Sequence, residues 1–134
     1  MDQTFLLDVD KFIKKAKGRT ELFVREFLQD MNEIVVRYTP VETGNLRGSW
    51  WANIGEADTK GGMLDKTGGT AIARMNLVAS QVIIGQVYYA MNGANYAIYV
   101  ENGTSRMAPR AFVRTAMILS PGIASEAAKR VSEL

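Results

Sequence analysis

The stretch DVDKFIKKAKGRTELFVREFLQDMNEIVVRY, residues 8–38, decides the fold of this chain. Its apolar and small side chains recur at steps of three and four, the spacing of one face of an α-helix. They are Val9, Phe12, Ile13, Ala16, Thr20, Phe23, Phe27, Met31, Ile34 and Tyr38. Because the pattern keeps its phase across Gly18, we predict one long helix with Asp8 as its N-cap, weakened by roughly 1 kcal/mol at Gly18. Two helices broken at residues 18–20 are the alternative.

After this helix, the residue pattern predicts strands. Pro40 ends the helix, because a proline disfavours the helical conformation in the residue before it. Side chains then alternate over residues 46–54, which predicts a strand with Trp51 on its exposed face. Residues 82–91 carry β-branched and aromatic side chains on both faces, which predicts a second strand, central in its sheet. Glycines and few apolar residues make residues 55–70 a long exposed loop.

Further helices are expected in the second half of the chain. Alanine content favours a short helix over residues 71–79, whereas residues 96–100 fit either a strand or one helical turn. Beyond Pro109 an apolar stripe predicts a C-terminal helix, either kinked or restarted at Pro121. We therefore predict one α+β domain over residues 1–134, with an antiparallel sheet of three to five strands. The long N-terminal helix packs on one face of this sheet, and the C-terminal helix flanks it.

The composition limits the chemistry that the chain can perform. It has no cysteine and no histidine, which excludes disulfides, Cys/His zinc sites and catalysis by either side chain. The net charge of +2 is too small to mark a nucleic-acid binder by bulk charge. The apolar runs are too short to cross a membrane, and the N-terminus lacks the features of a signal peptide. We expect a protein made in the cytoplasm, with no membrane partner, no cofactor, no metal and no enzymatic activity.

Basic residues gather in two places. The first helix carries a basic run, made of Lys11, Lys14, Lys15, Lys17 and Arg19. This run fits a solvated helix face, or a surface that faces phosphates or an acidic partner. A second row, at steps of four, consists of Arg106, Arg110 and Arg114. Like charges at helical spacing repel, so the second row predicts an acidic partner.

Two carboxylates could be mistaken for catalytic groups. Asp65 begins DKTGGT, which resembles the phosphorylated-aspartate motif of P-type ATPases but has one glycine too many, so we interpret it as a polar loop. Glu101 lies in an apolar and aromatic stretch, with no second carboxylate at helical or strand spacing. We predict that Glu101 forms a salt bridge to Arg47 or Arg114.

Two signature segments resemble a known family, and residues 65–73 resemble the Asp-Lys-Ser-Gly loop and the start of the following helix in the same family. Residues 39–50, TPVETGNLRGSW, are similar to the Thr-Pro-Val-Asp-Thr-Gly-x-Leu-Arg-x-x-Trp segment of long-tailed bacteriophage neck or tail-completion proteins, minor tail components grouped with lambda minor tail protein Z. Residues 96–105, YAIYVENGTS, followed by Ala-Pro at 108–109, resemble the second signature of that family. The matching positions are Thr39, Pro40, Thr43, Gly44, Leu46, Arg47, Trp50, Tyr96, Glu101, Gly103, Ser105 and Pro109. Met107 departs from the pattern, since the family often has glutamine there.

The resemblance implies a structural virion protein of the phage neck. Such a protein completes the tail and joins it to the head connector, as a six-fold ring of copies of itself. Its partners would be the connector or stopper protein, the tail terminator or tail tube protein, and, through non-specific contact, the genomic DNA in the lumen. A terminator ring that caps the tail tube and a small nucleic-acid-binding module are the alternatives. The basic run on the first helix would face DNA, and the candidate interface residues are Trp51, Arg106, Arg110, Phe112 and Arg114.

Overall fold

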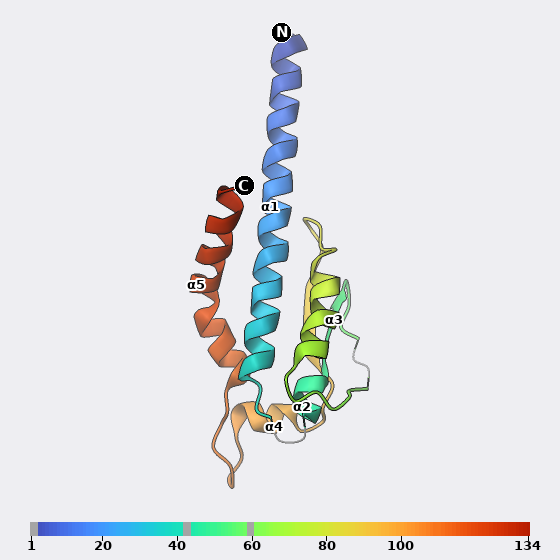
Figure 1. Cartoon of the computed structure of the whole chain (residues 1–134), viewed down its shortest axis with the longest axis vertical. Helices are drawn as coiled ribbons and strands as arrows, with labels where there is room; N and C mark the ends of the chain where they lie inside the picture. Colours follow the sequence, from blue (N-terminus) through green and yellow to red (C-terminus); the bar gives the residue numbers. More distant parts are fainter. Residues whose placement is uncertain (1–2, 42–43, 59–60) are drawn as a thin grey trace.

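A computed structural model of the chain describes residues 3–41, 44–58 and 61–134. In these residues the elements follow in the order α1 (Gln3–Tyr38), α2 (Asn45–Gly48), β1 (Trp50–Ile54), α3 (Gly69–Ala79), β2 (Tyr88–Asn92), α4 (Ala97–Asn102) and α5 (Phe112–Ser132). Helix α1 runs through the middle of the molecule, with α5 along one side and α3 along the other (Figure 1). The architecture mixes helices with a small antiparallel sheet, as predicted in outline.

Helix α1 is continuous, which confirms the single long helix predicted from the apolar stripe. It begins at Gln3, so Asp8 lies inside the helix and the predicted N-cap there is wrong. Residues 8–20 are exposed, and this part of α1 extends past the C-terminal end of α5 (Figure 1). We call residues 8–20 the arm. A Cβ on Gly18 would meet nothing within 4 Å, so this glycine makes no close packing contact that requires it.

The sheet has two strands in the described residues, not the three to five that were predicted. β1 and β2 pair antiparallel, with Trp50 opposite Asn92 and Ile54 opposite Tyr88. Helix α3 packs against β1, and α1 packs against α3 and α5. The helix beside the sheet is therefore α3, whereas the sequence assigned that place to the long N-terminal helix.

Two stretches predicted as strand are not extended. Residues 82–87 turn, because Gly85 adopts a φ of +95°. Val82 is buried, but Ile83, Ile84 and Val87 are exposed, so this stretch is a surface turn and not a buried central strand. Residues 46–48 belong to the short helix α2, which leaves β1 to begin after them.

The remaining helices follow the predictions more closely. Helix α3 confirms the short helix predicted after the loop, which spans residues 55–68. Helix α4 covers most of the ambiguous residues 96–100, and α5 is one helix that runs through Pro121. Since Pro121 lacks an N–H, it cannot bond the Met117 carbonyl four residues before it. The Ser120 hydroxyl donates to that carbonyl instead, at 2.7 Å.

The core lies where α1, α3, α5 and β1 meet. Its buried side chains are Val35, Val36, Leu46, Trp50, Ala71, Met75, Phe112 and Ala116. The rings of Trp50 and Phe112 meet edge to face, with their centroids 6.2 Å apart, an arrangement that their quadrupoles favour. This contact joins β1 to the start of α5.

A chain of polar side chains crosses this core. The Tyr88 hydroxyl donates to the side-chain oxygen of Asn32 at 2.8 Å, and the Asn32 amide donates to the side chain of Asn76 at 3.0 Å. Asn32 is 2% exposed, so these bonds satisfy polar atoms that would be costly to bury alone. Burial raises the pKa of Tyr88 to about 12, with the Asn32 hydrogen bond acting in the opposite direction. The polar chain ties β2 to α1 and α3.

Candidate functional site

Residues 39–50 and 96–109, the two stretches that carry the resemblance, are called the first and second matched segments. Arg47, in the first matched segment, caps the C-terminal end of α1. Its guanidinium donates to the carbonyls of Thr39 at 2.7 Å, Lys66 at 2.8 Å and Arg37 at 2.9 Å. The last carbonyls of a helix lack partners within the helix, and a cation there also favours the helix dipole. Arg47 therefore fixes the end of α1 to the loop that precedes α3.

Thr39 and Trp50 of the same segment form a buried hydrogen-bonded pair. The Trp50 indole N–H donates to the Thr39 hydroxyl at 2.9 Å, and that hydroxyl donates to the Val35 carbonyl at 2.6 Å. Neither residue is more than 4% exposed, so the pair satisfies polar groups inside the core. Pro40 follows at the half-buried end of the helix.

Gly44 allows the first segment to fold back on the loop after β1. Its φ is +89°, and a Cβ there would lie 2.7 Å from the backbone nitrogen of Lys66. Only glycine avoids both the strain and the clash. Leu46 follows in the core at 5% exposure, and Thr43 lies outside the described residues.

Asp65 caps helix α3, which supports its interpretation as part of a structural loop. Its carboxylate accepts hydrogen bonds from the backbone N–H groups of Gly68 at 3.1 Å and Ala71 at 3.0 Å. The Thr67 hydroxyl donates to the same carboxylate at 3.3 Å. A carboxylate in this place satisfies free N–H groups at the start of a helix.

Arg74 is a structural residue that the sequence analysis missed. Its guanidinium donates to the carbonyls of Gly48 at 2.9 Å and Trp50 at 3.1 Å, and it lies over the Trp51 ring, 3.7 Å from the centroid. Burial lowers the pKa of Arg74, with Asp65 acting in the opposite direction. Trp51 is half-buried beneath this cation, which corrects its predicted exposure. The sequence held one sign of this role, a lone arginine among the apolar residues of α3.

Glu101, in the second matched segment, caps helix α5. Its carboxylate accepts hydrogen bonds from the backbone N–H groups of Val113 at 2.7 Å and Arg114 at 3.2 Å. The guanidinium of Arg114 lies 3.3 Å from the same carboxylate, whose side chain is 14% exposed. Of the two salt bridges predicted for Glu101, the one to Arg114 forms. The carboxylate therefore holds the start of α5 in place.

Residues 103–111 form a loop at one end of the molecule, between α4 and α5 (Figure 1). We call these residues the end loop. Backbone hydrogen bonds hold it: Thr104 N–H donates to the Met107 carbonyl at 2.8 Å, and Arg110 N–H to the Val100 carbonyl at 2.9 Å. The Thr104 hydroxyl also accepts a hydrogen bond from the Arg106 N–H at 3.2 Å. The loop shape is thus set at its base and at its tip.

Gly103 is required at the beginning of the end loop. Its φ is +78°, and a Cβ there would lie 2.7 Å from the nitrogen of Pro109. Ser105 and Met107 are exposed on the loop, so neither contributes to the core. The signature residues of this segment therefore shape an exposed loop.

The predicted interface residues occupy different environments. Arg106 and Arg110 lie exposed on the end loop, and only Arg114 lies on α5, so the three do not form one helical row. Phe112 is 2% exposed and belongs to the core, which corrects its predicted place on a surface. Among these residues, Arg106 and Arg110 are the exposed cations of the end loop.

The two matched segments meet beside the end loop. The Asn45 side-chain amide donates to the Tyr96 hydroxyl at 2.9 Å, and the Asn92 amide donates to the Leu46 carbonyl at 2.8 Å. These bonds join the turn after α1 to the region around α4. The structure thus joins the two segments at Asn45 and Tyr96.

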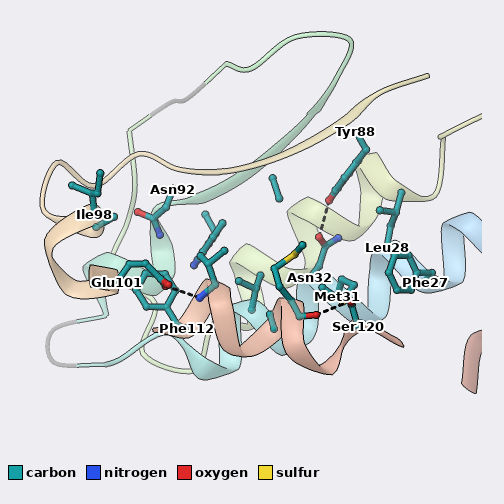
Figure 2. Close-up of a pocket in the computed structure, with 17 residues that line it drawn as sticks. Phe27, Leu28, Met31, Asn32, Tyr88, Asn92, Ile98, Glu101, Phe112 and Ser120 are labelled. Carbon is teal, nitrogen blue, oxygen red and sulfur yellow. Dashed lines mark hydrogen bonds between the residues drawn. The ribbon is translucent and has the colours of Figure 1, made fainter. Parts of the chain in front are cut away.

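An apolar hollow of about 570 Å³ opens next to this junction (Figure 2). It is lined by Trp50 and by parts of residues 27–35, 88–92, 97–101 and 112–120. Ile98 is 63% exposed and Met117 is 62% exposed, so large apolar side chains stand open to solvent at its rim. We call this feature the apolar hollow.

The arm carries most of the basic run of α1 beyond the rest of the molecule, and Arg19, at its base, donates to the Leu134 carbonyl at 3.5 Å. All five of its basic side chains are exposed, and Lys14 pairs with Asp10 at 3.1 Å. Residues 1–20 contain five basic and three acidic side chains, and residues 21–134 contain eleven of each. Residues 1–20 therefore hold the whole net charge of the chain.

No family model, curated protein or solved structure matches this chain. Within the described residues, no group of three or more acidic side chains could hold a metal ion. None of the helices described is long and apolar enough to cross a membrane. The candidate site is therefore described by its own geometry: the end loop, the apolar hollow and the arm.

Proposed function

We propose that this protein is a structural component of a long-tailed phage neck, which completes the tail and joins it to the head connector as a ring of copies of itself. The observation that carries the proposal is the meeting of the two matched segments through Asn45 and Tyr96. Both segments resemble neck proteins, and together they frame the end loop and the apolar hollow.

Exposed apolar side chains around the hollow support a role in assembly. Ile98 and Met117, which line the hollow, are 63% and 62% exposed, respectively. Large exposed apolar patches mark surfaces that bind other proteins. In a virion, a neighbouring ring subunit, the head connector or stopper, or the tail terminator or tube protein would cover them.

Electron microscopy of phage particles that lack this protein tests the proposal. We expect separate full heads and free tails, because an absent neck protein leaves both halves complete but unjoined. Tails of uncontrolled length would instead indicate the terminator function. Normally joined particles would reject both functions.

Charge reversal on the end loop tests whether this loop contacts a partner. We expect the double variant Arg106→Glu/Arg110→Glu to fold but to leave heads and tails unjoined, because both side chains are exposed and the loop is held by backbone bonds. Lys66→Glu is the matched control, since it reverses an exposed charge elsewhere. Normal joining by the double variant would reject a role for the loop. Arg114 is unsuitable for this test, because it pairs with Glu101 at the start of α5, so its reversal would also disturb the fold.

A second candidate function is non-specific DNA binding by the arm, favoured by its five exposed basic residues. Phosphate contacts release counterions, so the affinity for duplex DNA would then fall steeply with salt concentration. Replacement of Lys11 and Lys15 by glutamine would flatten this dependence. A weak affinity that is indifferent to salt would reject the DNA-binding function.

A further inference from the structure

The arm presents an apolar face that nothing covers within the described chain. Phe12 is 72% exposed, Ile13 56% and Val9 38%. At 3.6 residues per turn these side chains share the face of α1 that carries Phe23 and Phe27 lower down, where the helix is partly buried. Phosphate binding needs the lysines but gives no reason for this apolar face, so the arm requires a protein surface.

The charge of the arm restricts what that surface can be. Lys15 and Arg19 flank one edge of the apolar face, and Lys17 flanks the other. Residues 8–20 carry five basic against two acidic side chains, so the arm is positively charged. Two arms packed against each other would bring these like charges together, which disfavours arm-to-arm pairing. The complementary surface is an apolar groove with acidic walls.

The chain itself carries such a groove, on the flank where α1 and α5 meet. Its apolar floor is made of Ile34, Leu119 and Ile123, and Gly122 leaves open space beside them. Three carboxylates line it, those of Asp30, Glu33 and Glu126. Arg130 pairs with Asp30 and also with Glu26, and Arg37 pairs with Glu33, so four carboxylates surround the groove against two cations. We call this feature the α1–α5 groove, and its volume is about 560 Å³.

The dimensions of the arm and the groove agree. Thirteen residues of helix span about 20 Å, and the stretch of α5 from Leu119 to Arg130 spans about 17 Å, at 1.5 Å per residue. The arm cannot reach the groove of its own chain, because residues 8–20 and Asp30 lie on one continuous helix. A second copy must supply the groove.

We infer that the arm of one copy docks its Phe12 face in the α1–α5 groove of a second copy. Lys15, Lys17 and Arg19 then face the groove carboxylates, in the manner of an amphipathic helix held in a groove. Each copy offers one arm and one groove, so the contact is head-to-tail and extends until it closes into a ring. The inference rests on the self-association in the proposed function and names the two surfaces that produce it.

Two charge-reversal variants of the full chain test the inference by light scattering coupled to size exclusion. The arm variant is Lys15→Glu/Lys17→Glu, and the groove variant is Glu33→Lys/Glu126→Lys. Lys66→Glu is the control, and circular dichroism checks that each variant folds. We expect the mass of the wild type and of the control to rise with protein concentration. Each double variant alone should associate at least about tenfold more weakly.

The mixture of the two variants gives the decisive measurement. The arm variant keeps an intact groove, and the groove variant keeps an intact arm, so the mixture should form a species of two chains that grows no further. A mixture that stays monomeric, or a groove variant that associates like the wild type, overturns the inference. So does a wild-type chain that stays monomeric while it binds duplex DNA.

The result also separates this inference from the proposed function. The predicted pattern of association, together with normally joined phage particles that lack the protein, would retain arm docking and reject the neck function. Unjoined heads and tails, together with variants that associate like the wild type, would retain the neck function and reject arm docking.

Discussion

The carboxylate of Glu101 accepts a hydrogen bond from the backbone N–H of Val113 at 2.7 Å, across the end loop. The contact joins the last turn of α4 to the first turn of α5, so Glu101 acts as a helix cap. Its role is structural in this chain, and it fixes how the end loop is presented.

Replacement of Glu101 by alanine should therefore lower the free energy of unfolding by about 1–2 kcal/mol, the usual cost of losing a helix cap. Urea denaturation measures this change. Glu56→Ala, at an exposed loop position, is the control and should have no comparable effect. Equal stability of both variants would contradict the assignment of Glu101 as the cap.

The bond between Trp50 and Thr39 should appear as a coupling energy. Thr39→Val should cost about 1–3 kcal/mol, because it leaves the buried Trp50 N–H without its acceptor. In the double variant Thr39→Val/Trp50→Phe, the loss should be smaller than the sum of the two single losses by about 1 kcal/mol. Denaturation of all four proteins closes the cycle, and strictly additive losses would refute the coupling.

Arg47→Lys should lower the free energy of unfolding by about 2 kcal/mol, although it keeps the charge. A lysine ammonium cannot reach the three carbonyls that the planar guanidinium bonds at once. Arg106→Lys makes the same replacement at an exposed position and should be neutral. If the two variants unfold at the same urea concentration, the role of Arg47 at the end of α1 is wrong.

Gly18→Ala should strengthen the arm, because alanine favours a helix by about 1 kcal/mol over glycine and a Cβ there meets open space. Amide exchange in residues 8–17 should slow by about fivefold, the factor that corresponds to this energy. Gly103→Ala should act in the opposite direction on overall stability, since its Cβ would clash with Pro109 at a φ of +78°. Unchanged exchange in the arm would show that its helix does not depend on Gly18.

Stability should fall between about pH 10 and pH 12 because of Tyr88. Its pKa in the folded chain is about 12, above the ordinary value of 10.0, so the unfolded chain loses its proton first. The contribution of Tyr88 is complete below pH 10 and disappears as the pH rises through 12. Comparing Tyr88→Phe with the wild type across this range isolates the effect, and parallel stability curves would contradict it.

The helices could be predicted from the sequence because helix periodicity is a local property. The stripe that begins at Val9 and the one that begins at Phe112 kept their phase, and the structure contains a continuous helix at each. The periodicity could not show where packing stops, so the exposure of Phe12 on the arm was hidden in a pattern typical of a core.

The sheet and most of the site could not be predicted, because they depend on contacts between distant residues. The β-branched residues after Val82 fit a strand or an exposed turn, and the φ of Gly85 decides for the turn. Arg74 reaches the carbonyl of Trp50 across two elements, which no local pattern indicates. The pair of Glu101 and Arg114 was foreseeable, because an acidic residue in an apolar stretch needs a cation.

The end loop keeps its shape through bonds between backbone atoms, such as the one from Arg110 N–H to the Val100 carbonyl. Such bonds do not depend on which side chains the loop carries. During evolution, the shape of the end loop and its choice of binding partner can therefore change independently. Mutation at Ser105, Arg106 or Arg110 can redirect the loop toward a different partner while the fold of the lineage stays the same.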